Sequence, residues 1–217
     1  GSEMCIRDRL DDLRARELVF RRETSAFAEA REHIFKHALL RDVTYESVLL
    51  RVRQAYHALV ADWLIEHAGG RAGEFTGMIA DHLDLAGNNI QARQYLLEAG
   101  KQAASKFANE EAISYLTRAL TLTAETELKG RFKLLLERVQ IYDLTGSRDA
   151  QEADINAMET LAEEMGDGER QAKAFLQEVR FALEIGDYTR SVEAAKKAVG
   201  LAREIRNEEL EAAGHRY

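Results

Sequence analysis

The chain has 217 residues, a formal net charge of −8, no proline and one cysteine, Cys5. One cysteine excludes an internal disulfide, and no apolar run is long enough to cross a bilayer, so we expect a cytoplasmic protein without membrane contact. The charge is uneven: residues 13–57 hold nine basic and six acidic side chains, whereas residues 58–217 hold nineteen and twenty-eight. The acidic C-terminal part disfavours nucleic acid as a partner.

The first residues, GSEMCIRDR, have no periodic apolar pattern. The DNA GGC TCG GAG ATG TGT ATA AGA GAC AG encodes this stretch up to Asp8 and opens a codon for serine or arginine, in agreement with Arg9. It resembles the end of a transposon-type sequencing-library adapter, whereas a cloning scar would explain only Gly1 and Ser2. We therefore expect residues 1–9 to be adapter-derived, and the rest to be a cysteine-free metagenomic piece of a longer protein, truncated at both ends.

Residues 10–48 carry the only strand-like pattern. Residues 10–16 are typical of the end of a short helix, and the runs ELVFRR (17–22) and EHIFK (32–36) are apolar-rich and roughly alternating. Two such runs joined by a modest loop predict a β-hairpin. A helix, a hairpin and then more helix is the layout of the C-terminal half of a winged-helix domain.

The rest of the chain, residues 49–217, has helical periodicity throughout. Apolar residues recur at i, i+3, i+4 and i+7 spacing, and glycines stand between the periodic segments, where helix C-caps belong. We expect the apolar stripes to be core seams, with Asn109 as an N-cap before Glu110 and Glu111. The predicted helices cover residues 49–67, 74–86, 90–107, 110–122, 127–145, 149–165, 169–185 and 188–206.

Several of these helices also repeat one another. The segments GNNIQARQYLLEAG (87–100), FANEEAISYLTRAL (107–120) and GDYTRSVEAAKKAV (186–199) superpose without gaps, and residues 146–161 do so with a two-residue insertion. The pattern resembles helix B of a tetratricopeptide (TPR) repeat, with small residues spaced by 20, 41 and 38 positions. We therefore predict an all-α fold: a TPR-like α-solenoid of antiparallel helix pairs, with repeats longer than 34 residues and a small winged-helix remnant at the N-terminus.

The most distinctive stretch is HIFKHALLRDVTYESVLLRVRQAYHALVADWLIE (33–66). It resembles the junction between winged helix and TPR-like array in bacterial STAND-type signalling ATPases. The resemblance continues through MIADHLDLAGNNIQAR (78–93) and VQIYDLTGSRDAQEADI (139–155). It implies an AAA-like ATPase upstream that binds ATP or ADP with Mg²⁺, and before it an adenylate or guanylate cyclase domain. Because the same family includes transcription regulators, the resemblance indicates the architecture better than the output.

In that family a winged-helix histidine within a Met-His-Asp motif senses the β-phosphate of bound ADP. His37 stands at the matching position in FKHALLRD, although Lys36 replaces the methionine and Ala38 the aspartate. The resemblance implies that His37 is a nucleotide-phosphate sensor in the full-length protein, since an imidazole can donate a hydrogen bond to a phosphate. The alternative is that His37 caps or packs at the turn between strand and helix.

Catalytic and metal sites are not expected in this chain. It has no G-x-x-x-x-G-K-[ST] loop for phosphates, so neither cofactor nor catalytic residue is predicted and the chain itself should not be an enzyme. The His33–His37 pair lacks a third ligand for a metal. We expect His57, His67 and His82 to be structural.

These observations predict a non-catalytic regulatory module that binds a polypeptide partner or its own upstream ATPase domain. Such an array offers a groove for a peptide, and binding there would bias the junction near His37. Two alternatives remain open. One is part of a DNA-binding transcription regulator, which Arg21 and Arg22 on the wing favour and the interleaved glutamates disfavour. The other is a stand-alone TPR scaffold.

Overall fold

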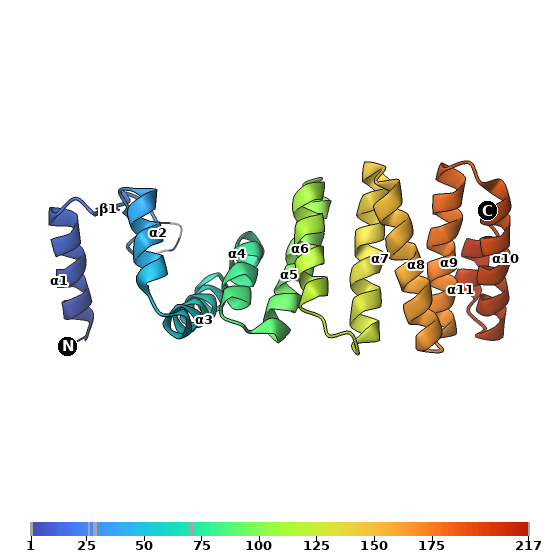
Figure 1. Cartoon of the computed structure of the whole chain (residues 1–217), viewed down its shortest axis with the longest axis horizontal. Coiled ribbons are helices and arrows are strands. Elements are labelled where there is room, and N and C mark those ends of the chain that lie inside the picture. Colours follow the sequence, from blue (N-terminus) through green and yellow to red (C-terminus); the bar gives the residue numbers. More distant parts are fainter. Residues whose placement is uncertain (1, 26, 28–29, 70–71, 217) are drawn as a thin grey trace. The chain divides into compact units, whose positions relative to one another are not determined.

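The computed structural model describes residues 2–25, 27, 30–69 and 72–216 (Figure 1). This part of the chain consists of α-helices packed on their sequence neighbours and one two-stranded antiparallel sheet, so the predicted all-α, solenoid-like fold is confirmed. None of the helices described here combines the length and the apolar character that crossing a bilayer requires. The chain divides into two compact units, unit 1 (residues 1–88) and unit 2 (residues 89–217).

Unit 1 contains the predicted β-hairpin and four helices. Val19 pairs with Phe35 and Arg21 with His33, so both strands lie inside the predicted runs. The first helix extends back to Ser2, through the adapter-like residues, where only a helix end near residues 10–16 was expected. Its elements are α1 (Ser2–Ala15), β1 (Val19–Arg21), β2 (His33–Phe35), α2 (Ala38–Ser47), α3 (Leu50–His67) and α4 (Ala72–Leu85).

The sides of helix α3 differ in their environment. Ala61 and Leu64 are buried in the contact between α3 and α4. The predicted stripe also included Leu64, which is buried as expected, and His67. The remaining members lie on another side and are exposed, so the expectation of a core seam is wrong for them. An i, i+3, i+4 pattern marks a face of a helix, and a face is buried only where another element covers it. We call the exposed apolar members the α3 apolar face: Leu49, Val52, Tyr56, Leu59, Val60 and Trp63.

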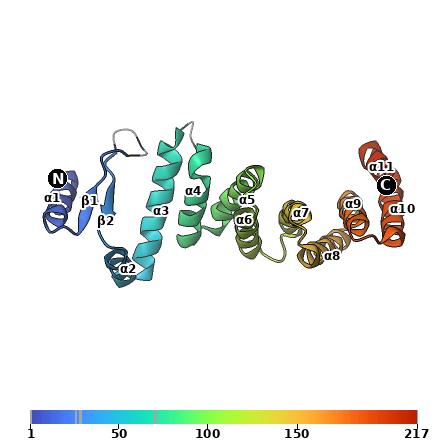
Figure 2. The same ribbon diagram turned by 90° about the horizontal axis from the view of Figure 1, so that it is seen from above.

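Unit 2 is a row of helices in which each packs against the next in sequence (Figures 1 and 2). The predicted stripe of α7 is confirmed as core, because Phe132, Leu135 and Val139 are buried with Met158 of α8 and Phe181 of α9. The helices are α5 (Asn89–Ser105), α6 (Asn109–Thr121), α7 (Leu128–Thr145), α8 (Arg148–Glu164), α9 (Gly168–Glu184), α10 (Tyr188–Glu204) and α11 (Glu208–Gly214).

The turns recur with a regular spacing. Residues in the left-handed region follow most of the helices, as the glycine pattern predicted, and a positive φ there ends a helix. Their spacing is 20 positions from one turn to the next, except where the longer α6–α7 connection makes it 39. One helix with its turn therefore takes 20 residues, and one helix pair takes about 40. These residues are Gly87, Phe107, Gly146, Gly166, Gly186 and Arg206.

This period corrects the alignment of the repeats. Segments 87–100 and 107–120 lie in α5 and α6, which pack against each other, so they are partners in one pair and not equivalent helices of successive repeats. Helix α8 fits the pattern without the expected insertion, because Gln151 is 1% exposed while Ala153, the residue the insertion would align, is exposed. The equivalent buried positions are Ala112, Gln151 and Ser191, spaced by 39 and 40 residues.

Small residues bring neighbouring helices together, as predicted. A Cβ atom at Gly100 of α5 would lie 2.9 Å from the Leu116 Cγ of α6, so this pair packs at close range. The predicted N-cap at Asn109 is wrong, because Ala108 occupies the N-cap position of α6 and makes no side-chain capping bond. Glu110 and Glu111 do lie in the first turn of α6, where negative charge complements the helix dipole.

Candidate functional site

His37 lies at the turn between β2 and α2, where the sequence placed it. It is the N-cap residue of α2, with extended backbone angles of φ −127° and ψ 130°. Its side chain is exposed and makes no capping hydrogen bond, so the capping alternative for this residue is wrong. The preceding Lys36 donates a 2.6 Å hydrogen bond to Glu17, and this bond and the lysine charge lower the pKa of the Glu17 carboxyl.

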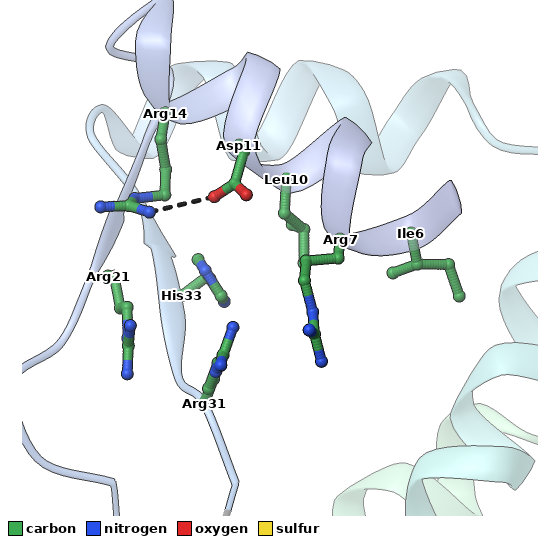
Figure 3. A pocket seen from close by; sticks show the side chains of 8 residues that line it. All are labelled: Ile6, Arg7, Leu10, Asp11, Arg14, Arg21, Arg31 and His33. Atoms are coloured by element: carbon green, nitrogen blue, oxygen red, sulfur yellow. Dashed lines mark hydrogen bonds and ion pairs between the residues drawn. The ribbon is translucent and has the colours of Figure 1, made fainter. Parts of the chain in front are cut away.

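A basic pocket of about 310 Å³ lies between α1 and the β-hairpin (Figure 3). Figure 3 shows guanidinium groups from both elements gathered around His33, with Arg14 joined to Asp11 at 3.0 Å. Asp11 is the single acidic residue of the lining, so the pocket suits an anion. Its lining residues are Ile6, Arg7, Leu10, Asp11, Arg14, Arg21, Arg31 and His33, of which Ile6 and Arg7 belong to the adapter-like stretch.

Ion pairs on the hairpin neutralise part of this positive charge. Arg22 donates a 2.8 Å hydrogen bond to Glu32, which agrees with the expectation that interleaved glutamates oppose phosphate binding. Among the residues that the structure describes, no carboxylate pairs with Arg21 or Arg31. The hairpin therefore offers two unneutralised arginines beside His33.

Two of the histidines expected to be structural form a pair that the sequence did not reveal. The Nδ1 atoms of His57 on α3 and His82 on α4 are 2.8 Å apart, and His57 Nε2 is 2.8 Å from the Tyr45 hydroxyl. Burial lowers the pKa of both imidazoles, and the charges of Arg53 beside His57 and of His57 beside His82 act in the same direction. A neutral pair, one ring donating and the other accepting, holds α3 to α4.

The His33–His37 pair considered from the sequence is not brought together on one helix face, because His33 lies in β2 and His37 directly precedes α2. Within the described ranges, no group of three or more histidine, cysteine, aspartate or glutamate side chains has the geometry to hold a metal ion. His67 stacks on Trp63 with ring centroids 4.5 Å apart. The His67 ring therefore packs against another side chain at the end of α3.

The α3 apolar face is exposed along most of its length, and at its C-terminal end the Trp63 ring packs against the Phe27 ring at 4.6 Å. Tyr56 and Leu59 are 59% and 63% exposed, and they share a face with Val52 and Trp63 by their helical spacing. The polar side of α3 is separate and carries Asp62. Monomeric proteins rarely leave a continuous apolar stripe of this length open, and such stripes mark surfaces for another protein.

Comparisons with known proteins found a curated relative and similar solved structures. No family model matches the chain. Uncharacterized protein R02095 of Rhizobium meliloti (strain 1021) is 32% identical over 104 residues, which cover 46% of this chain and 10% of that protein. The chain thus matches about a tenth of that relative's length. The crystal structure of BtubC (BKLC) from P. vanneervenii has a TM-score of 0.46 and 13% identity, over 72% of this chain and 75% of that chain, a likeness too low to inform on function.

Proposed function

We propose that the chain is a non-catalytic regulatory and protein-interaction module of a larger STAND-type signalling ATPase. In this proposal, unit 1 contains the junction between a winged helix and a TPR-like array, and unit 2 continues the array. The observation that carries the proposal is the α3 apolar face, since it needs a protein partner and lies within the stretch 33–66 that resembles the family junction.

The partner that this face suits best is the ATPase domain upstream in the same protein. An apolar stripe along one helix is complementary to a second apolar helix or sheet face, and its burial removes side chains such as Leu59 from water. Helix α2 adds Leu39 and Val43, which are 75% and 60% exposed and lie four positions apart on one face. Arg51, on the polar side of α3, would remain at the rim of such an interface.

The length of the similar protein supports this view. The matched region is a small part of R02095, so a chain of this type occurs within a much larger protein. ATP or ADP with Mg²⁺ would bind to the upstream domain, and the exposed side chain of His37 would reach the nucleotide phosphate there. The output, a nucleotide cyclase in the family that the sequence resembles, would be set by that nucleotide state.

The test begins with the source DNA upstream of Leu10, which is expected to encode a Walker A loop. The upstream ATPase region is then expressed, and its binding to this chain is measured by calorimetry with ADP and with ATP. Leu59→Glu should weaken binding at least tenfold, because it places a charge in the apolar contact. Asp62→Lys on the polar side of α3 is the matched control and should bind as the wild type does.

His37 has a separate readout in the same experiment. His37→Ala in the full-length protein should weaken ADP binding and raise ATPase activity, without changing the affinity of the α3 apolar face for the ATPase domain. Unchanged ADP affinity and ATPase activity would remove His37 from the mechanism. A complete short reading frame without an ATPase would replace the proposal with a stand-alone TPR scaffold.

A second candidate function, duplex DNA binding by the winged-helix part, is favoured by the basic pocket. Arg21 and Arg31 beside His33 could contact phosphates, while the ion pair between Arg22 and Glu32 opposes this. Anisotropy of a labelled duplex at rising salt tests it, because phosphate contacts make affinity fall steeply with salt. Loss of binding in Arg21→Ala, with binding retained in Arg7→Ala, would assign the site to the hairpin and not to the adapter-like residues.

A further inference from the structure

Unit 2 has a pocket that is separate from the α3 apolar face. Its volume is about 420 Å³, and it opens across three consecutive helices, α8, α9 and α10. Acidic, aromatic and aliphatic side chains line it together, a mixture that suits a long side chain with one charged end. The lining residues are Glu159, Glu163, Gln171, Phe175, Lys197, Gly200, Leu201 and Glu204.

One lining residue of this pocket is a glycine inside a helix, and the same residue also lines a second pocket of about 390 Å³, so only variants at Glu159 report on the first pocket alone. Gly200 lies within α10, one turn before its end, and a Cβ atom built on it would meet no other atom within 4 Å. Glycine inside a helix is less stable than alanine, and packing does not require it here. Its effect is to leave the α10 backbone uncovered at the pocket, so that a ligand can approach closely.

The charge of the pocket is negative. Three glutamates line it against one lysine, and Lys197 has its Nζ atom 5.0 Å from the centre of the Phe175 ring. That contact shows the ring accepting a cation on its face. Leu201 and Phe175 together provide an apolar wall along which an aliphatic stem can lie.

Glu159 has an acidic neighbour beside the pocket. Its Oε1 atom is buried, and its carboxyl shares a hydrogen bond with the carboxyl of Glu178, so one of the two groups must hold the proton. Arg190 donates hydrogen bonds to Glu178 at 3.0 Å and to Glu152 at 2.5 Å. Two neighbouring carboxyl groups repel each other once both are ionised, and a cationic ligand would relieve this repulsion.

The electrostatic environment of the Glu159 carboxyl also favours a bound cation. Burial, the negative charge of Glu178 and a hydrogen bond with it raise the pKa of Glu159 to about 7, against the smaller opposing effect of Lys197 and Arg190. A cation placed in the pocket would favour the ionised form of Glu159 and so lower this pKa.

We propose that this pocket receives a lysine or arginine side chain from a polypeptide partner, with the charged group at Glu159 and the stem against Phe175 and Leu201. This inference rests on the proposed function, because it names a feature of the partner that the interaction module binds. A polypeptide is the source we infer, because the proposed module binds a protein and a basic side chain combines an N–H-bearing cation with an apolar stem.

The test uses the full chain and defined probes. Two side-chain analogues, N-acetyl-lysine-methylamide and N-acetyl-arginine-methylamide, are titrated to about 50 mM while amide NMR signals are followed, a range that detects millimolar affinities. Signals around Gly200 should shift and saturate with both cations. The neutral analogue N-acetyl-norleucine-methylamide should give at most a tenth of that shift.

Two matched pairs of variants locate the binding. Gly200→Phe places a ring at the pocket and should weaken binding at least tenfold, whereas Gly200→Ala, whose Cβ atom meets nothing within 4 Å, should stay within twofold of the wild type. Glu159→Gln should weaken binding about fivefold. Glu164→Gln, at an exposed residue of α8 that does not line the pocket, should leave binding unchanged. Folding of each variant is checked by circular dichroism.

The outcomes separate this inference from the proposed function. No saturable shift with either cation, or equal shifts in Gly200→Phe and wild type, would overturn the pocket assignment, even if the upstream ATPase binds the α3 apolar face. Saturable binding that Gly200→Phe abolishes would support the pocket. In that case failure of Leu59→Glu to affect ATPase binding would count against the proposed function alone.

Discussion

Helices α3 and α7 have the same length and similar apolar stripes, yet their environments differ. In α7, Phe132 and Val139 are buried because α6 and α8 pack on both sides of the helix. In α3, Tyr56 and Leu59 are exposed, because α4 covers a different side. An apolar stripe therefore shows which side of a helix can be buried. Whether that side is buried depends on the elements that pack against it.

The polar contacts of the two regions differ as well. In unit 2, Arg138 of α7 donates two hydrogen bonds of 2.7 Å to Asp154 of α8 and one of 2.8 Å to Thr117 of α6, so a single side chain joins three successive helices. In unit 1, α3 and α4 are joined by the neutral His57–His82 contact. We therefore expect the stability of unit 2 to rest mainly on packing and a buried ion pair, and the contact between α3 and α4 in unit 1 to weaken as pH falls.

The largest effect should come from truncating the buried stripe. Leu135→Ala removes a buried side chain from the core between α7 and α8, and should lower the free energy of unfolding by about 4 kcal/mol. Leu59→Ala on the α3 apolar face is the control, with an expected change below about 0.5 kcal/mol. Urea unfolding of both variants measures the difference. Equal losses would mean that the α3 apolar face is buried in solution.

Breaking the bidentate ion pair should rank second. Asp154→Ala leaves the Arg138 guanidinium in a site where its side chain is 13% exposed, and an unpaired charge there should cost about 3 kcal/mol. Arg14→Ala, which breaks the exposed pair with Asp11, should cost less than about 1 kcal/mol. The same urea experiment applies, and a cost for Asp154→Ala no greater than that control would contradict the role of the pair.

A smaller effect on the free energy of unfolding is expected at Glu159, and its size depends on pH. The pKa of this carboxyl is raised to about 7 in the folded chain, so its stabilising contribution is complete below pH 4.5 and is lost as pH rises through 7. Glu159→Gln mimics the protonated form and should raise stability at pH 8 by about 1 kcal/mol, after allowance for solvent screening of this half-exposed group. At pH 4.5 the variant should match the wild type in urea unfolding, and a gain of equal size at both pH values would be inconsistent with titration.

The smallest effect is expected at the histidine pair of unit 1. Both imidazoles have a lowered pKa, so the folded chain holds them neutral and their contribution is complete above pH 6.5. As pH falls below 6.5, the unfolded chain takes up protons first, and the unfolding midpoint should drop by about 2 °C by pH 5.5. His82→Gln should remove most of this drop, whereas His67→Gln, at the end of α3, should not. Thermal unfolding at pH 7.5 and pH 5.5 measures this drop in the midpoint for each variant.

Much of the fold could be predicted from the sequence, because helices and turns are local structures. Apolar periodicity placed α5 to α10 within about two residues of their observed bounds, whereas α11 was not predicted. Glycines such as Gly146 and Gly186 marked helix ends through their positive φ. Alternating apolar residues likewise placed the two strands, and the resemblance to a family junction placed His37 at the start of α2.

The tertiary structure alone decided which faces meet. Whether the stripe of α3 is covered depends on elements distant in sequence, and the pairing of His57 with His82 depends on how α3 and α4 pack. The contact between the carboxyl groups of Glu159 and Glu178 likewise follows from how α8 and α9 pack. Local patterns determine which helices form, since their hydrogen bonds close within a turn, whereas burial and charge pairing come from contacts between helices.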